Sequence, residues 1–209
     1  MSDISSDEDD LPDLPEIAAN SDIPRGQVSG WDDDTQGIEE EPNPHENPSK
    51  EILWAAERGE METVVNLIKQ NSSVVTATDK DGYTPLHRAC YNNHVEIASL
   101  LLKHGADLSA KTIDDWQPLH SACKWNSVQC AELLVSKGAD VNAVTKGGIT
   151  PLHLAASNSY ASEIMELLLM NTETDVNVKN DSDDLPVDVA RRTGKYDFLF
   201  DIAEPCFNA

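Results

Sequence analysis

Apolar side chains beyond residue 50 recur in short blocks that alternate with polar, turn-forming stretches. The blocks come in pairs, at 86–90 with 97–102, at 119–123 with 130–135, and at 152–156 with 164–169. Blocks of this length and spacing predict pairs of short helices. Neither helix of a pair can bury its apolar side alone, so stacking of neighbouring pairs has to supply the core. The pattern therefore predicts an all-α repeat protein.

A short motif marks the start of each pair. Thr-Pro-Leu-His at 84–87 recurs as Gln-Pro-Leu-His at 117–120 and Thr-Pro-Leu-His at 150–153, and a decayed copy, Leu-Pro-Val-Asp, lies at 185–188. The starts at 84, 117, 150 and 185 are 33, 33 and 35 residues apart. The longer spacing comes from two single-residue insertions, near 159–160 and within 171–174. A near-constant period indicates one structural unit used several times.

The residues at the ends of the expected helices suit those positions. A proline begins each first helix, where a missing N–H costs nothing: Pro85, Pro118 and Pro151. The residue before each proline is expected to cap the helix, well at Thr84 and Thr150 and less well at Gln117. Gly105 and Gly138 follow the second helices, where a left-handed residue is favoured. Local physics thus agrees with the repeat.

The motif, its following alanine and the 33-residue period together resemble the ankyrin repeat. The resemblance covers residues 50–209 and implies a solenoid of about five stacked helix-pair repeats with short β-hairpin turns. The expected repeats, in chain order, are 50–78, 79–111, 112–144, 145–179 and 180–209.

The first and last repeats of the array are expected to depart from the repeat pattern. The first repeat lacks the motif, and we expect Ser49 to cap a helix that begins at Lys50 or Glu51. The last repeat is expected as helices over 187–193 and 196–202. Its charged residues suit the polar outer face of a terminal repeat: Asp188, Arg191, Arg192 and Lys195.

Residues 1–49 differ in composition from the rest. They hold fifteen acidic residues, one basic residue (Arg25) and six of the eleven prolines. Such a segment cannot bury enough apolar area to offset the entropy of ordering, so a disordered acidic N-terminal tail is predicted. Ser5 and Ser6 precede an acidic run, which suits phosphorylation, and an unmodified solubilising tail is the open alternative.

The charge excludes several classes of partner. The formal net charge is −23, and residues 50–209 alone hold 23 acidic and 14 basic side chains without a basic stripe. We expect no nucleic-acid and no membrane partner. No apolar stretch reaches the roughly 18–20 residues of a membrane span. The acidic start is unlike a signal peptide. An intracellular protein, in the nucleus and/or cytoplasm, is expected.

Histidine and cysteine raise the question of metal or redox chemistry. His87, His120 and His153 occur once per repeat, on helix layers about 8–10 Å apart, whereas zinc needs ligands about 2 Å from one point. The resemblance implies instead that each histidine holds its turn through backbone hydrogen bonds. The same spacing exceeds the Cα limit of about 7 Å for a Cys90–Cys123 disulfide, so both are expected as buried thiols. We expect no cofactor, no metal and no enzyme activity.

The resemblance implies that a protein partner binds the concave face, made of hairpin tips and the exposed side of each first helix. The candidate positions are Tyr83, Tyr91, Asn92, Ile113, Asp114, Trp116, Lys124, Trp125, Lys146 and Ile149. Aromatic residues dominate many binding hot spots. The alternative is that some rings only cover the neighbouring hairpin. The predicted function is an adaptor or regulator, monomeric when unbound; a dedicated assembly chaperone for one client is the alternative.

Two further expectations come from resemblance. Asn142 and Asn177 lie in Asp-Val-Asn sequences, a setting in which ankyrin asparagines can be hydroxylated, or in which they can simply shape the turn between repeats. Stretches at 53–57, 118–126, 167–171 and 190–193 are not general repeat consensus and resemble one subfamily of small ankyrin proteins. That resemblance implies regulation of transcription or germ-cell development.

Overall fold

The computed structural model describes residues 44–194 and 196–207. After a 3-10 helix (Pro44–Glu46), these residues form five helix pairs, as predicted. The pairs are α1 (Pro48–Arg58) with α2 (Met61–Gln70), α3 (Pro85–Tyr91) with α4 (Val95–Lys103), α5 (Pro118–Lys124) with α6 (Val128–Ser136), α7 (Pro151–Ser157) with α8 (Ser162–Leu169), and α9 (Pro186–Thr193) with α10 (Phe198–Phe207). A second 3-10 helix (Ser72–Thr76) follows α2.

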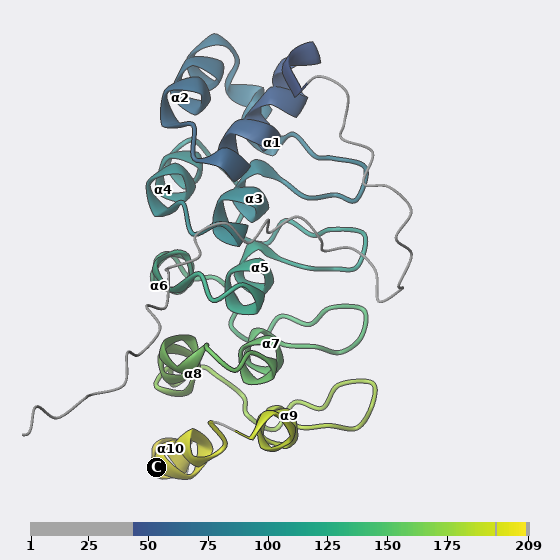
Figure 1. Cartoon of the computed structure of the whole chain (residues 1–209), viewed down its shortest axis with the longest axis vertical. Helices are drawn as coiled ribbons and strands as arrows, with labels where there is room; N and C mark the ends of the chain where they lie inside the picture. Colours follow the sequence, from purple (N-terminus) through teal and green to yellow (C-terminus); the bar gives the residue numbers. More distant parts are fainter. Residues whose placement is uncertain (1–43, 195, 208–209) are drawn as a thin grey trace, which may run out of the picture. The chain divides into compact units, whose positions relative to one another are not determined.

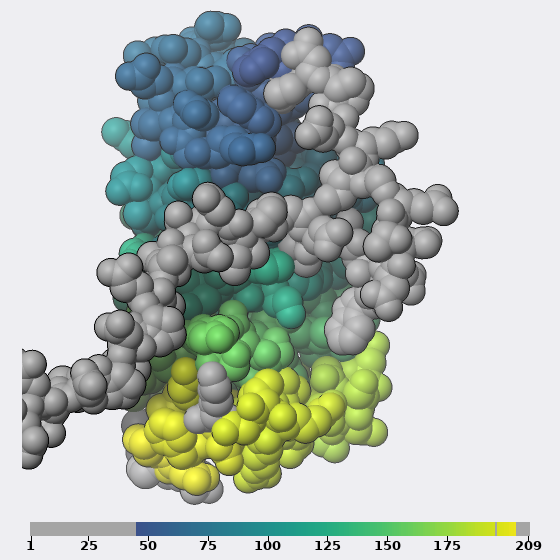
Figure 2. All heavy atoms as spheres, in the orientation of Figure 1, coloured from purple at the N-terminus to yellow at the C-terminus, as the bar shows by residue number. Residues whose placement is uncertain are grey.

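The first and second helices of the pairs form two columns. In Figure 1, α1, α3, α5, α7 and α9 make one column, α2, α4, α6, α8 and α10 make the other, and the connecting loops project from the side of the first helices. In Figure 2, the repeats appear as bands of colour that touch their neighbours directly. Leu86, Leu119 and Leu152 are fully buried at equivalent positions of three first helices, so each layer covers the apolar side of the next.

The expected hairpins are present as hydrogen-bonded turns. Within one turn the amide of Thr112 donates to the carbonyl of Trp116 at 3.0 Å. Between turns the amide of Ile113 donates to the carbonyl of Asp81 at 2.9 Å, and that of Lys146 to the carbonyl of Asp114 at 3.1 Å. None of the described residues is in a β-strand, because each turn has too few such bonds to form one. These bonds nevertheless link successive tips into a row.

The helix caps confirm some expectations and correct others. Thr84 and Thr150 accept from the amides of His87 and His153 at 3.4 and 3.3 Å, as predicted. Gln117 caps through its backbone carbonyl, which accepts from the amide of His120 at 2.9 Å. The expectation for Ser49 is wrong.

The cap of α1 is Asn47, whose Oδ1 accepts from the amide of Lys50 at 2.9 Å. Pro48 is the first residue of the helix, where its missing N–H costs nothing.

The closing pair departs from the expected polar outer face. Arg191 and Arg192 of α9 are exposed, as predicted, but α10 leaves Phe198 50% and Ile202 66% exposed. Lys195 lies outside the described residues. Within the part of the chain that the structure describes, no helix is both long and apolar enough to cross a bilayer.

Candidate protein-binding face

Each motif histidine joins its own turn to the next repeat. Nδ1 of His87 accepts from the amide of Thr84 at 3.2 Å, so Nε2 carries the proton and donates to the carbonyl of Trp116 at 3.0 Å. His120 and His153 repeat the pattern, with carbonyl acceptors at Ala143, Ile149 and Asp184. Both ring nitrogens are thus occupied by backbone groups, as the resemblance implied.

Burial keeps these imidazoles neutral. Loss of solvation lowers the pKa of His87 and of His120 to about 4, against hydrogen bonds to backbone carbonyls that raise it, and it lowers the pKa of His153 as well. Protonation of His87 at Nδ1 would also place its new N–H against the amide N–H of Thr84, from which Nδ1 accepts a hydrogen bond. The three histidines are therefore structural and uncharged at neutral pH. Cys90, Cys123 and Cys130 are fully buried thiols, as predicted.

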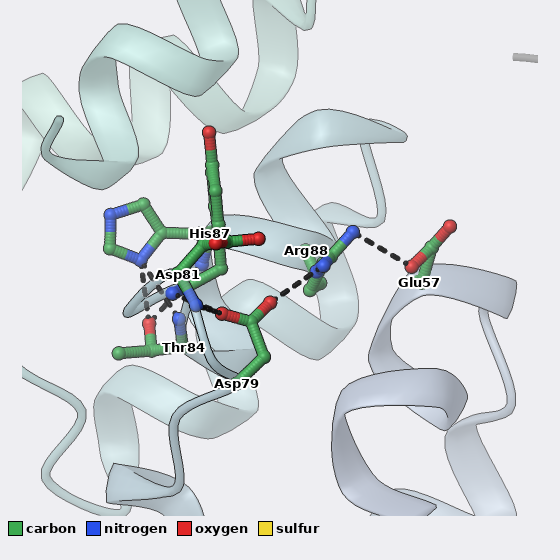
Figure 3. A network of polar contacts seen from close by, with 7 residues as sticks. Glu57, Asp79, Asp81, Thr84, His87 and Arg88 are labelled. Atoms are coloured by element: carbon green, nitrogen blue, oxygen red, sulfur yellow. Dashed lines mark hydrogen bonds and ion pairs between the residues drawn. The ribbon is translucent and has the colours of Figure 1, made fainter. Parts of the chain in front are cut away.

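The turn of the second repeat carries a charged network (Figure 3). Oδ1 of Asp79 accepts from the amides of Asp81 and Tyr83, both at 2.9 Å, and Oδ2 pairs with Arg88 at 2.6 Å. Arg88 also reaches Glu57 of the first repeat at 3.2 Å. Its guanidinium lies 5.2 Å from the ring centroid of Tyr83. The network holds the turn, the ring and the neighbouring repeat in one arrangement.

Tyr91 and Trp125 meet across two repeats. Their ring centroids are 4.8 Å apart with an interplanar angle of 53°, and both side chains are half-buried. Tyr91 ends α3 and Trp125 follows α5, so the pair lies where these first helices end. The two rings hold each other in place and leave part of their surface to solvent.

Trp125 occupies a position at which neighbouring repeats use asparagine. Asn92 donates to the carbonyl of Glu57 at 2.8 Å, and Asn158 donates to the carbonyl of Lys124 at 3.1 Å. Trp125 cannot donate an amide bond of this kind. The carbonyl of Tyr91 receives the hydroxyl of Ser127 instead, at 3.2 Å. The middle repeat thus has a ring at the asparagine position, and a serine hydroxyl makes the inter-repeat hydrogen bond to this carbonyl.

The remaining predicted positions divide into two groups. Tyr83 and Trp116 lie over His87 and His120, with centroid distances of 5.6 and 6.2 Å. Trp116 and Ile149 pack against the core, and Asn92 is used between repeats. Ile113, 55% exposed, Asp114 and Lys146 are open at the tips, and Lys124 is half-buried beside Trp125.

The four aromatic residues among the predicted positions make two kinds of contact. Tyr91 and Trp125 form a pair, whereas Tyr83 and Trp116 each cover the histidine of their own repeat.

One exposed position was not among the predictions. Val144 is 44% exposed where the other repeats have Thr78, Lys111 and Lys179. The sequence signal that could have identified Val144 is an apolar residue at a position that is polar in the other repeats.

The predicted modification sites differ in how much can be said of them. Asn142 donates to the carbonyl of Glu173 at 2.6 Å and accepts from the amide of Asp175 at 2.8 Å, which supports a structural role. Asn177 is exposed. Hydroxylation of either stays a prediction. Ser5 and Ser6 lie outside the described residues.

The fold and the turn chemistry define a class of protein, and comparison with known proteins agrees. A family model described as ankyrin repeats in three copies matches residues 38–112 and 109–180. The chain belongs to the ankyrin repeat family. Proteins of this family are generally interaction modules without enzymatic activity.

Within the family, the chain is similar to ankyrin repeat domain-containing protein 49. The protein of that name from Bos taurus is 52% identical over 198 residues, which is 89% of this chain and 83% of the relative. The one from Drosophila melanogaster is 52% identical over 204 residues, 97% and 95% of the two chains. Palmitoyltransferase akr1 from Schizosaccharomyces pombe matches over 56 residues only, 9% of its length. Neither relative at half identity has a catalytic name.

Proposed function

We propose that this chain binds a protein partner on the face formed by the turn tips and the exposed sides of the first helices, here called the partner face. The observation that carries the proposal is the replacement of an inter-repeat asparagine by Trp125. Folding alone gives no reason for it, because the asparagine bonds the repeats together and the ring leaves surface exposed.

The aromatic pair suits a binding centre. Trp and Tyr bury a large area with few rotatable bonds, and they are enriched at positions that dominate binding energy. Since Tyr91 and Trp125 already pack on each other, little further entropy is lost when a partner covers them. Ile113 and Asp114 at the neighbouring tip add an apolar and a polar contact.

The charges around the pair indicate what the partner carries. Arg88 is neutralised by Asp79 and Glu57. Lys124 and Lys146 take part in none of the ion pairs among the described residues. An extended partner segment with an apolar side chain for the ring pair and a carboxylate for Lys124 matches this arrangement.

The test is partner capture with a variant that separates binding from folding. Trp125→Asn installs the residue that neighbouring repeats use and offers its amide as a further donor to the carbonyl of Tyr91, which accepts from Ser127 in the wild type. We expect recovery of partners, read by mass spectrometry, to fall about tenfold or more while stability changes by about 1 kcal/mol at most. A Tyr91→Ala/Trp125→Ala double variant should abolish recovery.

Phe198→Ala is the matched control, since it removes an exposed aromatic residue from α10, outside the partner face. Full recovery by the folded Trp125→Asn variant would overturn the proposal.

We further propose a regulatory or adaptor role, in the nucleus or cytoplasm, in transcription or germ-cell development, on the strength of the subfamily resemblance. The relatives' names state the repeat domain alone. An assembly chaperone would instead be identified if this chain captures a newly made protein and is itself absent from the mature complex of that protein. We propose a monomer when unbound, for which sedimentation should give a mass near 22.9 kDa.

A further inference from the structure

Residues of α6 and α8 line a groove. Figure 1 shows these two helices in the column of second helices, on the other side of the first helices from the turn tips. The groove is shallow and largely open to solvent, with a volume of about 610 Å³. Its apolar side chains are Val128 and Val135 from α6, Leu167 from α8, and Met170 directly after α8. Met170 is 70% exposed, so the groove offers a contact area that the fold itself does not cover.

The sequence of α8 departs from its counterparts where it borders this groove. The position of Met170 is occupied by Lys103 in α4 and by Ser136 in α6. The last turn of α8 contains no basic residue, a feature that it shares with α6 and that leaves its C-terminus open to a cation from outside. The two insertions that lengthen this repeat also flank α8. None of these changes improves the helix, which points to a role outside folding.

The rim of the groove is acidic. Glu132 of α6 and Glu163 and Glu166 of α8 line it, all three exposed, and no lining residue is basic. None of these glutamates takes part in an ion pair among the described residues. Carboxylates gathered around an apolar floor repel one another, and a cationic partner relieves that repulsion.

We propose that this groove binds a basic amphipathic helix of a partner protein. Apolar residues at i, i+3, i+4 and i+7 of such a helix pack on the floor, and its flanking Lys or Arg residues meet the three glutamates. A cation at one end of the bound helix also lies near the C-terminus of α8, which has no basic residue of its own. This surface is independent of the partner face.

The test uses the full chain and two synthetic peptides. One is a Leu/Lys helix of about 18 residues with leucines at helical spacing. The other has the same composition in an order that disperses the leucines. The acidic N-terminal residues attract both peptides equally. Fluorescence anisotropy should show at least about tenfold tighter binding of the ordered peptide.

Two variants and one matched control assign the binding to the groove. Glu163→Lys and Met170→Ser should each weaken the ordered peptide about fivefold or more, since they change a rim charge and the exposed floor residue. Glu96→Lys makes the same charge change at the equivalent exposed position of α4 and should alter affinity less than about twofold. All three positions are on the surface, so circular dichroism should show an intact fold.

Equal binding of the two peptides, an equal loss with Glu96→Lys, or binding of the ordered peptide weaker than about 1 mM would each overturn the proposal.

Discussion

The three repeats that carry the motif histidine differ from the closing repeat in how they hold a turn. His120 accepts from the amide of Gln117 through one ring nitrogen and donates to the carbonyls of Ala143 and Ile149 through the other. Asp188 takes the same position in the last repeat and accepts from the amide of Leu185 at 3.1 Å. A carboxylate has no proton to donate at neutral pH, so it closes its own turn and cannot hold another one.

The two regions also differ in the strength of their polar contacts. The histidine bonds are buried and neutral. The closing repeat relies on exposed ion pairs, such as Arg191 with Asp188 at 3.6 Å and Arg192 with Asp184. Buried bonds that cannot be replaced by water are costly to break, whereas exposed pairs contribute about 0–1 kcal/mol. Both of these ion pairs lie within the closing repeat, whereas its contact with the repeat before it includes the bond from His153 to the carbonyl of Asp184 at 3.1 Å. The closing repeat is therefore held by a histidine of its neighbour, and its own residue at that position acts only within its own turn.

The largest expected effect is a loss of stability in mild acid. Because the folded-state pKa of His87 and His120 is about 4, below the ordinary histidine value of 6.5, the unfolded chain binds protons more readily. The stability that neutral histidine gives is complete above pH 6.5 and is lost as the pH falls to about 4, on the order of 3 kcal/mol for each. Urea unfolding across this range measures it.

Replacing both histidines by asparagine should flatten the pH dependence. The net charge of −23 makes the test selective, since protonating carboxylates relieves repulsion and acts in the opposite direction. The same change of stability with pH in the wild type and in the double variant would contradict the assignment of neutral, buried histidines.

A pair of alanine variants compares the two regions directly. His120→Ala should cost about 3 kcal/mol, because it leaves a cavity and removes three hydrogen bonds to backbone groups. Asp188→Ala should cost about 1 kcal/mol, the value of one helix cap. Urea denaturation midpoints give both. Equal losses would show that the histidine acts only within its own turn.

Substitution of two glycines by alanine distinguishes the cost of a left-handed backbone from the cost of a clash between repeats. Gly148 (φ +68) lies at a turn tip, where an added Cβ would come 3.1 Å from the Cα of Asn180 in the closing repeat. Gly138 (φ +86) has open space around it. We expect thermal and urea unfolding to show a loss of about 2 kcal/mol for Gly148→Ala and about 1 kcal/mol for Gly138→Ala. The reverse order would mean that turn tips do not contribute to stacking.

The smallest expected effect concerns the charged turn of the second repeat. Thr112 and Ser121 stand where this repeat has Asp79 and Arg88. Asp79→Thr and Arg88→Ser should each cost about 1 kcal/mol, and the double variant less than their sum, because both single changes remove the same ion pair between Asp79 and Arg88. Arg88 keeps its pair with Glu57 in the Asp79→Thr variant. A double-mutant cycle in urea measures the coupling. Additive losses would show that the ion pair contributes nothing beyond its two residues.

Much of the fold could be predicted because the repeat depends on nearby residues. Pro85 and Thr84 act on the same helix turn, and the period of the motif, continued to a first repeat that lacks it, indicated five pairs. The wrong expectation at Ser49 has a similarly local cause. Asn47 is a good cap and precedes a proline, so the helix begins two residues before the position that a Ser49 cap would require. The exposed Phe198 and Ile202 could not be predicted, because a helical pattern does not say which apolar side stays uncovered.

The candidate site was only partly within reach of the sequence. Register in the repeat identified the positions that face outwards, including Tyr91 and Trp125. It also grouped rings by repeat, whereas the observed pair joins two repeats, 34 residues apart. Asn92 was assigned to a partner and is bonded to Glu57 instead. The only sequence sign of the groove between α6 and α8 is Met170, an apolar residue at a position that is polar in α4 and α6. This sign can be interpreted only once the structure shows the residues that line the groove with it.

The sequence by itself determined the repeat, the helix pairs, most caps and the neutral histidine turns, because each rests on residues a few positions apart and on a period that any reader can count. Tertiary structure alone decided how one layer lies on the next. The offset between layers places the carbonyl of Trp116 beside His87 and the carbonyl of Glu173 beside Asn142. It also places Tyr91 against Trp125. These contacts join residues about one repeat apart, and their geometry follows from the packing of whole helices.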